Sequence, residues 1–367
     1  MELVVSLCLC VLALVSIQGC SGADSQSHSG GAGSSYVVSM LQSPVTEAAS
    51  LTVADIAALV GSAVSQAGGM DFIRDGQTVV LKPNLPTVYQ DNGETLASPT
   101  VSGINTDWRV TKSVADLVRA KNPTGKILIM EGSTFATNIA YAALGYTSEN
   151  FGSSVDEFIA LEGASCTETS TTALEQHMGP SGKQYWVDRR YLMADITVSI
   201  PTLATDIWAG IGGAVESMGI GATPAGQYSS GENPNDCTRA KIDRSTPETT
   251  GAFIRDYYAI KPADFVVVDG LQGLEHGPLP ILDHSSYDYG ASIKNMRLIL
   301  AGRNAVAVDT TLALVMKCDP KKVPHLTKLE ADGLGTTDTA RITVVGAKPS
   351  DVSKPFASRQ TEICPGN

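Results

Sequence analysis

The sequence lacks several motifs that would assign a chemistry at once. It has no Cys-x-x-Cys pair, the spacing that zinc ribbons and ferredoxin-type clusters use for their ligands, so no iron–sulfur cluster is expected. It also lacks a Gly-x-Ser-x-Gly elbow, a Walker loop and a His-Glu-x-x-His motif, which disfavours α/β-hydrolases, P-loop NTPases and zincins. Positive charge is scarce, because 26 Lys and Arg stand against 38 Asp and Glu. Phosphate binding needs clustered Lys and Arg, so nucleic acid is not expected as a partner.

The N-terminus is predicted to be a targeting segment. Residues 3–17 form an uncharged, mostly apolar run that is shorter than a typical membrane span. We therefore expect residues 1–19 to be a signal peptide and residues 20–36 to be a Ser/Gly-rich flexible linker.

The tetrapeptide IQGC ends at Cys20 and resembles a bacterial lipobox. It predicts lipidation of Cys20 and an exported lipoprotein of the cell envelope, periplasmic or on the cell surface, that contacts the membrane through its lipid anchor. Gln18 and the absence of basic residues after Met1 depart from that pattern. Secretion without lipidation is the alternative.

The remaining cysteines indicate disulfides. Two of the seven cysteines fall in the signal peptide and Cys20 is the candidate lipid carrier, which leaves four in the mature domain. An even number of cysteines in an oxidising compartment favours disulfide bonds. The expected pairs are Cys166–Cys237 and Cys318–Cys364, although the sequence alone does not fix the connectivity and four free buried thiols are the alternative.

Residues 37–367 are predicted to form one α/β domain with a mostly parallel, doubly wound sheet flanked by helices. Apolar β-branched runs alternate with amphipathic helical patterns, which is typical of such sheets. The expected strands are 78–81, 126–130, 195–200, 265–273, 297–302 and 341–346, and the expected helices are 50–69, 106–122 and 304–318. Residues 210–244, rich in Gly, Pro and polar side chains, are predicted to be a long loop excursion over the C-terminal edge of the sheet.

Polar side chains follow the ends of four predicted strands. Because the carboxyl ends of parallel strands share one edge, and ligands bind outside that edge, we expect a common polar pocket there. In the alternative interpretation, a Lys–Glu or Lys–Asp pair braces the sheet edge and accounts for the same residues. The side chains concerned are those of Lys82, Asn84, Glu131, Ser133, Asp206 and Asp269.

A second polar cluster lies in the sequence LEHGPLPILDH, which begins at Leu274. Carboxylate and imidazole ligands suit zinc, iron or manganese. Asp269, Glu275 and His276 are therefore candidate metal ligands, and a divalent ion is a candidate cofactor. The spacing matches no known metal motif, and solvated loop side chains are the alternative.

Six segments resemble the family defined by domain of unknown function 362 and occur in its order: VVLKPNL, NTDWRVTKSVADLV, ILIMEGS, ADITVSIPTL, VVVDGLQGLEHGP and LILAGRNAVAVDTTLALVMKCDPKKVPHLTKLEADGLG. The resemblance covers about residues 75–346. It implies a single α/β domain with no assigned reaction, to which some members attach an iron–sulfur module that this chain lacks. The positions that match the family pattern are Lys82, Asn84, Asp107, Glu131, Asp269, Gly277, Pro278 and Asp309.

The chain departs from the family pattern at positions where many members carry cations. A Leu-Lys-x-His segment is here Leu203-Ala204-Thr205-Asp206, and a later Lys-Asn pair is Glu216-Ser217. Either the change turns an anion site into a carboxylate-rich one for a hard cation or a cationic substrate, or it marks a degenerate copy without the activity. The carboxylates concerned are Asp206, Glu216, Asp269 and Glu275.

We therefore expect an exported domain that binds a small ligand or a metal ion in a polar pocket, with an unassigned reaction. The alternatives are an inert surface lipoprotein that binds or scaffolds partners, in which a Lys82 ion pair leaves no pocket, and an accessory protein of redox-cofactor metabolism. The candidate catalytic residues are Asp206, Asp269 and Glu275, and the candidate ligand-binding residues are Lys82, Asn84, Asp107, Glu131, Ser133 and Asp309.

Overall fold

The computed structural model describes residues 35–88, 95, 102–161, 166, 172–233, 235–278, 280, 283 and 285–366. The predicted signal peptide, Cys20 and most of the predicted linker lie outside these residues. In the described part of the chain, no helix has the length and apolar character needed to span a membrane.

One large sheet with a parallel centre organises the fold. Its strands follow the order β12-β1-β11-β10-β7-β2-β3-β4, with β8 and β9 continuing beside β10. Strands β10, β7, β2, β3 and β4 run parallel to one another, and β11 is antiparallel to both β10 and β1. The strands of this sheet are β1 (Tyr36–Gln42), β2 (Thr78–Pro83), β3 (Lys126–Glu131), β4 (Glu157–Ala160), β7 (Ile196–Ile200), β8 (Thr202–Asp206), β9 (Gly210–Gly212), β10 (Phe265–Leu274), β11 (Ile293–Gly302) and β12 (Ile342–Gly346).

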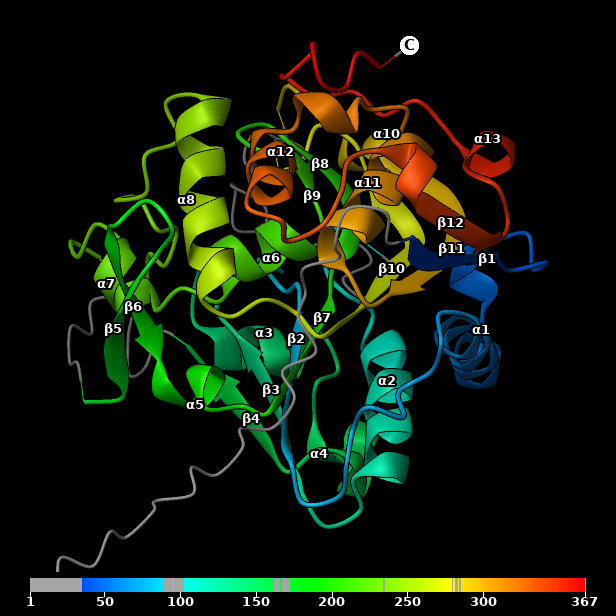
Figure 1. Cartoon of the computed structure of the whole chain (residues 1–367), viewed down its shortest axis with the longest axis horizontal. Coiled ribbons are helices and arrows are strands. Elements are labelled where there is room, and N and C mark those ends of the chain that lie inside the picture. The colour runs from blue at the N-terminus through cyan, green and yellow to red at the C-terminus, as the bar shows by residue number, and fades with distance from the viewer. Residues whose placement is uncertain are drawn as a thin grey trace, which may run out of the picture.

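Helices cover both faces of the sheet, which confirms the predicted mixed α/β architecture (Figure 1). One face packs against α1 (Val53–Gln66), α2 (Trp108–Lys121), α3 (Thr137–Ala143) and α4 (Ser148–Phe151). The opposite face packs against α6 (Ala214–Gly221), α8 (Pro247–Ile260), α11 (Ala305–Val315), α12 (Pro324–Ala331) and α13 (Pro349–Val352). The other elements are a hairpin of β5 (Leu174–Met178) and β6 (Gln184–Asp188), and the short helices α5 (Arg189–Leu192), α7 (Ala225–Tyr228) and α10 (Tyr289–Ser292).

Side-chain alternation along the strands assigns each residue to one of these two layers. In β2, Val79 and Leu81 lie in the core under α1 and α2, whereas Val80 lies in the core under α6, α8 and α11. Because the side-chain period of a strand is two, Lys82 continues the series of Val80. In β10, Val267 lies in the α1–α2 core, and Asp269 continues that series.

The structure contains elements that the sequence did not predict, among them β1 and those within residues 210–244. Strand β1 was not predicted, because it is only seven residues long and directly follows the Ser/Gly-rich segment. It pairs with both β11 and β12. Residues 210–244 are not one loop, since they contain β9, α6 and α7. Helix α1 begins at Val53, within the predicted range 50–69, and the side chain of its N-cap Thr52 accepts a hydrogen bond from the backbone of Asp55 in a capping box.

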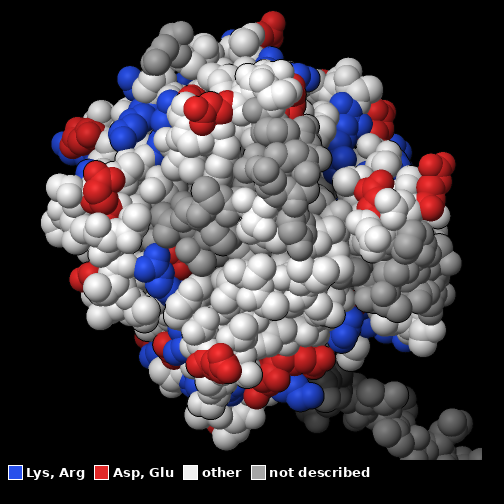
Figure 2. All heavy atoms as spheres, turned by 180° about the vertical axis from the view of Figure 1, so that it is seen from behind, with Lys and Arg blue, Asp and Glu red and all other residues white. Residues whose placement is uncertain are grey.

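The face shown in Figure 2 carries basic and acidic side chains in small, mixed groups around its edge. Neither sign of charge forms a continuous area in this view, and residues of other types predominate at its centre.

Candidate functional site

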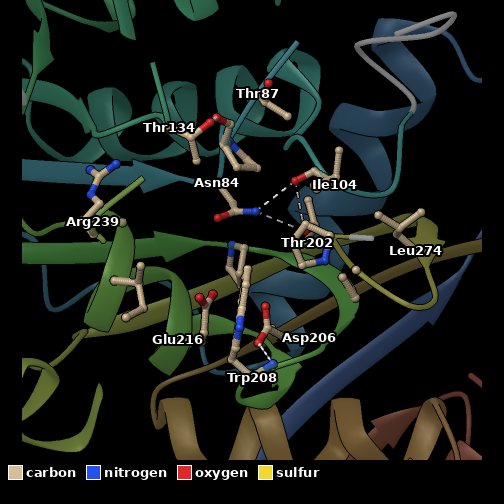
Figure 3. A pocket seen from close by; sticks show the side chains of 18 of the residues that line it. Asn84, Thr87, Ile104, Thr134, Thr202, Asp206, Trp208, Glu216, Arg239 and Leu274 are labelled. Carbon is tan, nitrogen blue, oxygen red and sulfur yellow. Dashed lines mark hydrogen bonds between the residues drawn. The ribbon is translucent and has the colours of Figure 1, made fainter. Parts of the chain in front are cut away.

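A cavity of about 360 Å3 lies at the carboxyl ends of β2, β3, β8 and β10. The ends of β2, β3 and β10 belong to the predicted edge, whereas β8 was not predicted as a strand. Residues 204–250 form much of the opposite wall. Figure 3 shows side chains from these segments converging on one space. The residues that line the cavity include Asn84, Ile104, Glu131, Thr134, Phe135, Thr202, Ala204, Asp206, Trp208, Gly212, Glu216, Ile220, Arg239, Arg244, Leu274, Gly277 and Pro278.

Two carboxyl groups, of Asp206 and Glu216, share this cavity and lie near each other in Figure 3. Asp206 Oδ1 accepts hydrogen bonds from the backbone N–H groups of Trp208 (2.8 Å) and Ala209 (2.6 Å), which fixes its side chain at the end of β8. Burial raises the pKa of Asp206. Burial and the neighbouring Asp206 raise the pKa of Glu216 to about 8, so Glu216 retains its proton at neutral pH.

Glu216 is held in place by a contact between two helices. It lies in the first turn of α6, and Asp309 of α11 accepts hydrogen bonds from the first N–H groups of α6, those of Ala214 (2.8 Å) and Val215 (2.9 Å). Burial raises the pKa of Asp309 to about 7, although the two N–H groups oppose this shift. Asp309 does not line the cavity; it caps the helix that carries Glu216 into it.

Two arginines from the segment after α7 complete the wall. Arg239 is buried, and its guanidinium donates to the carbonyl oxygens of Ser133, Cys237 (2.6 Å) and Thr223 (3.2 Å), which ties the segment to the end of β3. Arg244 lies with its guanidinium carbon 5.0 Å from the Trp208 ring centroid. Asp206 and Glu216 both attract the Arg244 charge.

Lys82 does not line the cavity, because its side chain is fully buried and already paired. Its Nζ lies 2.6 Å from Glu131 Oε2 and 2.6 Å from the Pro83 carbonyl oxygen. Burial lowers the pKa of Lys82 and raises the pKa of Glu131, and the contact between them partly offsets both shifts. The pair braces β2 against β3 as in the alternative interpretation, yet Glu131 also forms part of the cavity wall.

Asp269 lies at the same edge as Lys82 but on the opposite face of the sheet. Its Oδ2 accepts a hydrogen bond from the backbone N–H of Asp107 (2.7 Å), the residue that caps α2. Asp107 in turn forms an ion pair with Arg109 (2.6 Å). Burial and the nearby Asp107 raise the pKa of Asp269 to about 7. The two aspartates hold the start of α2 against the sheet, away from the cavity.

The candidate metal ligands are not brought together. Glu275 forms an ion pair with Lys294 (2.6 Å), and the His276 ring lies 5.2 Å from that of Tyr287. Among the described residues, no group of three or more His, Cys, Asp or Glu side chains is arranged to hold a metal ion.

Asn84 and Ser133 are fixed by backbone carbonyls. Asn84 Nδ2 donates to the Ile104 carbonyl (2.9 Å), so its Oδ1 points away from that contact, as Figure 3 shows. Ser133 Oγ donates to the Leu85 carbonyl (2.6 Å) and connects the loops after β2 and β3. Asn84 lines the cavity, and Ser133 does not.

Residues 79–313 match the family model described as Domain of unknown function (DUF362). The chain belongs to this family. No match was found among curated proteins. Among solved structures, the lactate racemase apoprotein from Thermoanaerobacterium thermosaccharolyticum aligns with a TM-score of 0.39 and 12% identity, over 73% of this chain and 54% of that chain. This chain thus spans about half the length of that protein, and a similarity at this level carries no information about the site.

Three positions were expected from the sequence to depart from the family pattern. Ala204, Asp206 and Glu216 all line the cavity. The residues missed from the sequence are Trp208, Arg239 and Arg244, which also line it. The only feature of the sequence that pointed to these three residues was their position in or beside residues 210–244, the Gly- and Pro-rich segment expected over the C-terminal edge of the sheet.

Both expected disulfides form. Cys166 pairs with Cys237, and Cys318 pairs with Cys364. The first holds the segment that carries Arg239. The second anchors the C-terminal segment, in which Ser358 Oγ donates to the Asp206 carbonyl (3.1 Å) and Gln360 Nε2 donates to the Ile207 carbonyl (2.6 Å).

Proposed function

We propose that this DUF362 protein is an exported binding protein that holds a small organic ligand in the cavity at the carboxyl edge of its sheet. The observation that carries the proposal is the cavity itself, about 360 Å3 in volume, whose mixed wall holds the carboxyl groups of Asp206 and Glu216 beside Glu131. This volume lies in the range of small-molecule sites, about 300–1,000 Å3. A polar group with a displaced pKa in such a cleft is a recognised mark of a functional site.

Binding is favoured over catalysis by the fate of the candidate catalytic groups. Asp269 and Glu275 do not line the cavity, and Lys82 is neutralised by Glu131. Asp206 and Glu216 are left as the acidic groups facing a ligand beside Glu131. A metal ion is not part of the proposal, since the described residues offer no ligand set for one.

Export is supported by two independent features. The N-terminal 19 residues have the composition of a signal peptide, and the described domain contains two disulfide bonds. Disulfides persist mainly in oxidising compartments. Lipidation at Cys20 would then retain the domain at a membrane.

The test is a fragment screen by saturation-transfer NMR on wild-type protein and on Gly212→Leu. A Cβ on Gly212 would meet only Ala204 O (3.7 Å) and Glu216 Oε2 (3.8 Å), so a leucine there extends into the open cavity without disturbing the backbone. Because Gly212 lines the cavity, the larger side chain should reduce its free volume, and we expect fragments that bind the wild type to lose at least tenfold in affinity with Gly212→Leu. Gly61→Leu, at a helix position with nothing within 4 Å, is the matched control. If no fragment binds, or both proteins bind the same fragments equally, the cavity is not a ligand site.

A further inference from the structure

The hydrogen-bond donors around the cavity are mostly committed to the protein itself. Thr134, Thr202 and Thr250 donate through their hydroxyls to the carbonyl oxygens of Pro86, Ile104 and Thr246. Arg239 is likewise occupied by backbone carbonyls. A ligand therefore finds few free donors in the wall apart from the guanidinium of Arg244, which donates only to the Thr238 carbonyl within the described residues.

Several polar oxygens of the wall have no partner among the described residues, and they belong to carboxyl and amide groups. In the part of the chain that the structure describes, Glu216 makes no hydrogen bond or ion pair, and the contacts of Asp206 use only Oδ1. Asn84 Oδ1 is turned away from the carbonyl that binds its Nδ2. Such a wall is complementary to a ligand that brings its own N–H donors.

The charged groups of the cavity further limit the class of ligand that can bind. Asp206 and Glu216 are both half-buried and face the same cavity, and Arg244 forms no ion pair with either of them within the described residues. Arg244 instead donates to the Thr238 carbonyl (3.1 Å) and lies over Trp208. Two close carboxyl groups without a bound cation share a proton, and a cation between them removes the need for it.

We propose that the ligand carries an ammonium group, which binds between the carboxyl groups of Asp206 and Glu216, on a short apolar body that contacts Ile104, Phe135, Ile220 and Leu274. This inference rests on the proposed function and specifies its ligand class. Binding transfers the shared proton from Glu216 to solvent, and the ammonium nitrogen keeps its own protons. An anionic ligand is disfavoured, because it would meet the negative charge that the proton-sharing pair already carries.

The experiment is a calorimetric titration with three probes of one size: pentylamine, pentanol and pentanoate. We expect pentylamine to bind at least tenfold more tightly than pentanol, and pentanoate not to bind. The affinity for pentylamine should rise up to tenfold per pH unit from pH 6 to about 8 and then level off, because Glu216 must lose its proton. The amine stays protonated over this range, as a lysine side chain does. Titrations in buffers of different ionisation enthalpy should show release of about one proton at pH 7.

Two variants test whether the preference for the amine arises at Asp206 and Glu216. Glu216→Gln should abolish both the preference for amine over alcohol and the pH dependence, and folding should be unaffected because Glu216 has no partner in the described chain. Asp206→Asn should weaken amine binding as well. Glu149→Gln, at an exposed position in the first turn of α4, is the control and should change nothing.

The outcomes separate this inference from the proposed function. Equal binding of pentylamine and pentanol, both lost in Gly212→Leu, would overturn the ammonium site while leaving the cavity as a ligand site. Tighter binding of pentanoate, or amine binding that is unchanged by Glu216→Gln, would also overturn it. Absence of binding by all three probes together with an empty fragment screen would overturn both.

Discussion

Lys82 and Glu131 meet across neighbouring parallel strands, with Nζ 2.6 Å from Oε2 and both side chains almost completely withdrawn from solvent. Gly221 of α6 lies directly above them, and a Cβ there would come within 2.8 Å of Lys82 Nζ. The pair therefore forms the floor under the helix that carries Glu216. The charges of the pair cancel, so this floor offers the cavity no free cation.

The first prediction concerns this pair. Lys82→Met leaves the Glu131 carboxyl group buried without its counter-charge, so we expect a loss of about 3–5 kcal/mol in the free energy of unfolding, measured with urea at pH 7. Adding Glu131→Leu should recover most of that loss, because an apolar pair needs no compensation. Lys121→Met breaks an exposed pair with Asp71 and should leave the stability nearly unchanged, because solvent screens such a pair. A double variant as unstable as the single one would show that the pair does not act through its charge.

The second prediction tests how α6 is held. A Cβ on Gly213 would lie 2.6 Å from Asp309 Oδ1, so Gly213→Ala must displace the carboxyl group that caps α6. Leaving two buried N–H groups without an acceptor should destabilise the protein by about 1–3 kcal/mol in thermal or urea unfolding. Gly212→Ala, at the adjacent position, meets nothing closer than 3.7 Å and should be near neutral. Equal stability of the two variants would contradict the capping role of Asp309.

The layered α/β fold was predictable because its strands are short apolar runs with strong β propensity, separated by capped helices such as the one that begins at Thr52. The shared edge followed from the parallel arrangement. The placement of Lys82 and Asp269 on opposite faces of the sheet was also encoded in the sequence. Leu81 and Val267 lie in the same core layer; Lys82 is one residue after Leu81 and faces away from that layer, whereas Asp269 is two residues after Val267 and faces it. The expectation of one common pocket overlooked this alternation.

The contacts of the cavity wall could not be predicted in the same way. Glu216 is positioned by Asp309, which is 93 residues later in the chain by its numbering, and Asp206 is fixed by an irregular turn and by the C-terminal segment. Such contacts depend on tertiary packing and leave no periodic pattern. The connectivity of the disulfides likewise depends on tertiary packing and cannot be derived from the sequence alone.

The third prediction concerns the N-terminus. If Cys20 is lipidated, wild-type protein expressed in a bacterium should partition into the detergent phase of Triton X-114, and Cys20→Ala should move to the aqueous phase. Mass spectrometry should show the lipid mass on wild-type protein alone. Identical partition of both proteins would favour secretion without an anchor.

The fourth prediction concerns the disulfide between Cys166 and Cys237, which closes a loop of 71 residues. The Cys237 N–H donates to the carbonyl of Thr134 (2.9 Å) at the cavity wall, so the bond anchors the wall as well as the chain. Replacing both cysteines by alanine should destabilise the protein by up to about 4 kcal/mol and weaken ligands found in the fragment screen. The reference is Cys8→Ala, in the predicted signal peptide, which should leave the folded domain unchanged. Unaltered stability and binding in the double variant would remove the structural role of this bond.

The fifth prediction concerns His325, which is fully buried in α12 and whose two ring nitrogens have no hydrogen-bond partner among the described residues. Burial lowers its pKa to about 3. The unfolded chain takes up a proton near pH 6.5, whereas the folded protein does not until about pH 3. Stability should therefore fall by about 1.4 kcal/mol for each pH unit between 6.5 and 3 because of this residue alone.

His325→Leu removes this proton uptake and fills the site with a side chain of similar size. We expect it to equal or exceed the wild-type stability at pH 7.5, since no buried nitrogen is left unpaired, and to gain further on it at pH 5, as measured by urea unfolding at both values. His177→Leu, which removes a solvent-exposed histidine, should follow the wild-type pH dependence. If His325→Leu loses stability on acidification as steeply as the wild type does, another group dominates that pH range, and the burial of His325 is not what limits the acid stability of the domain.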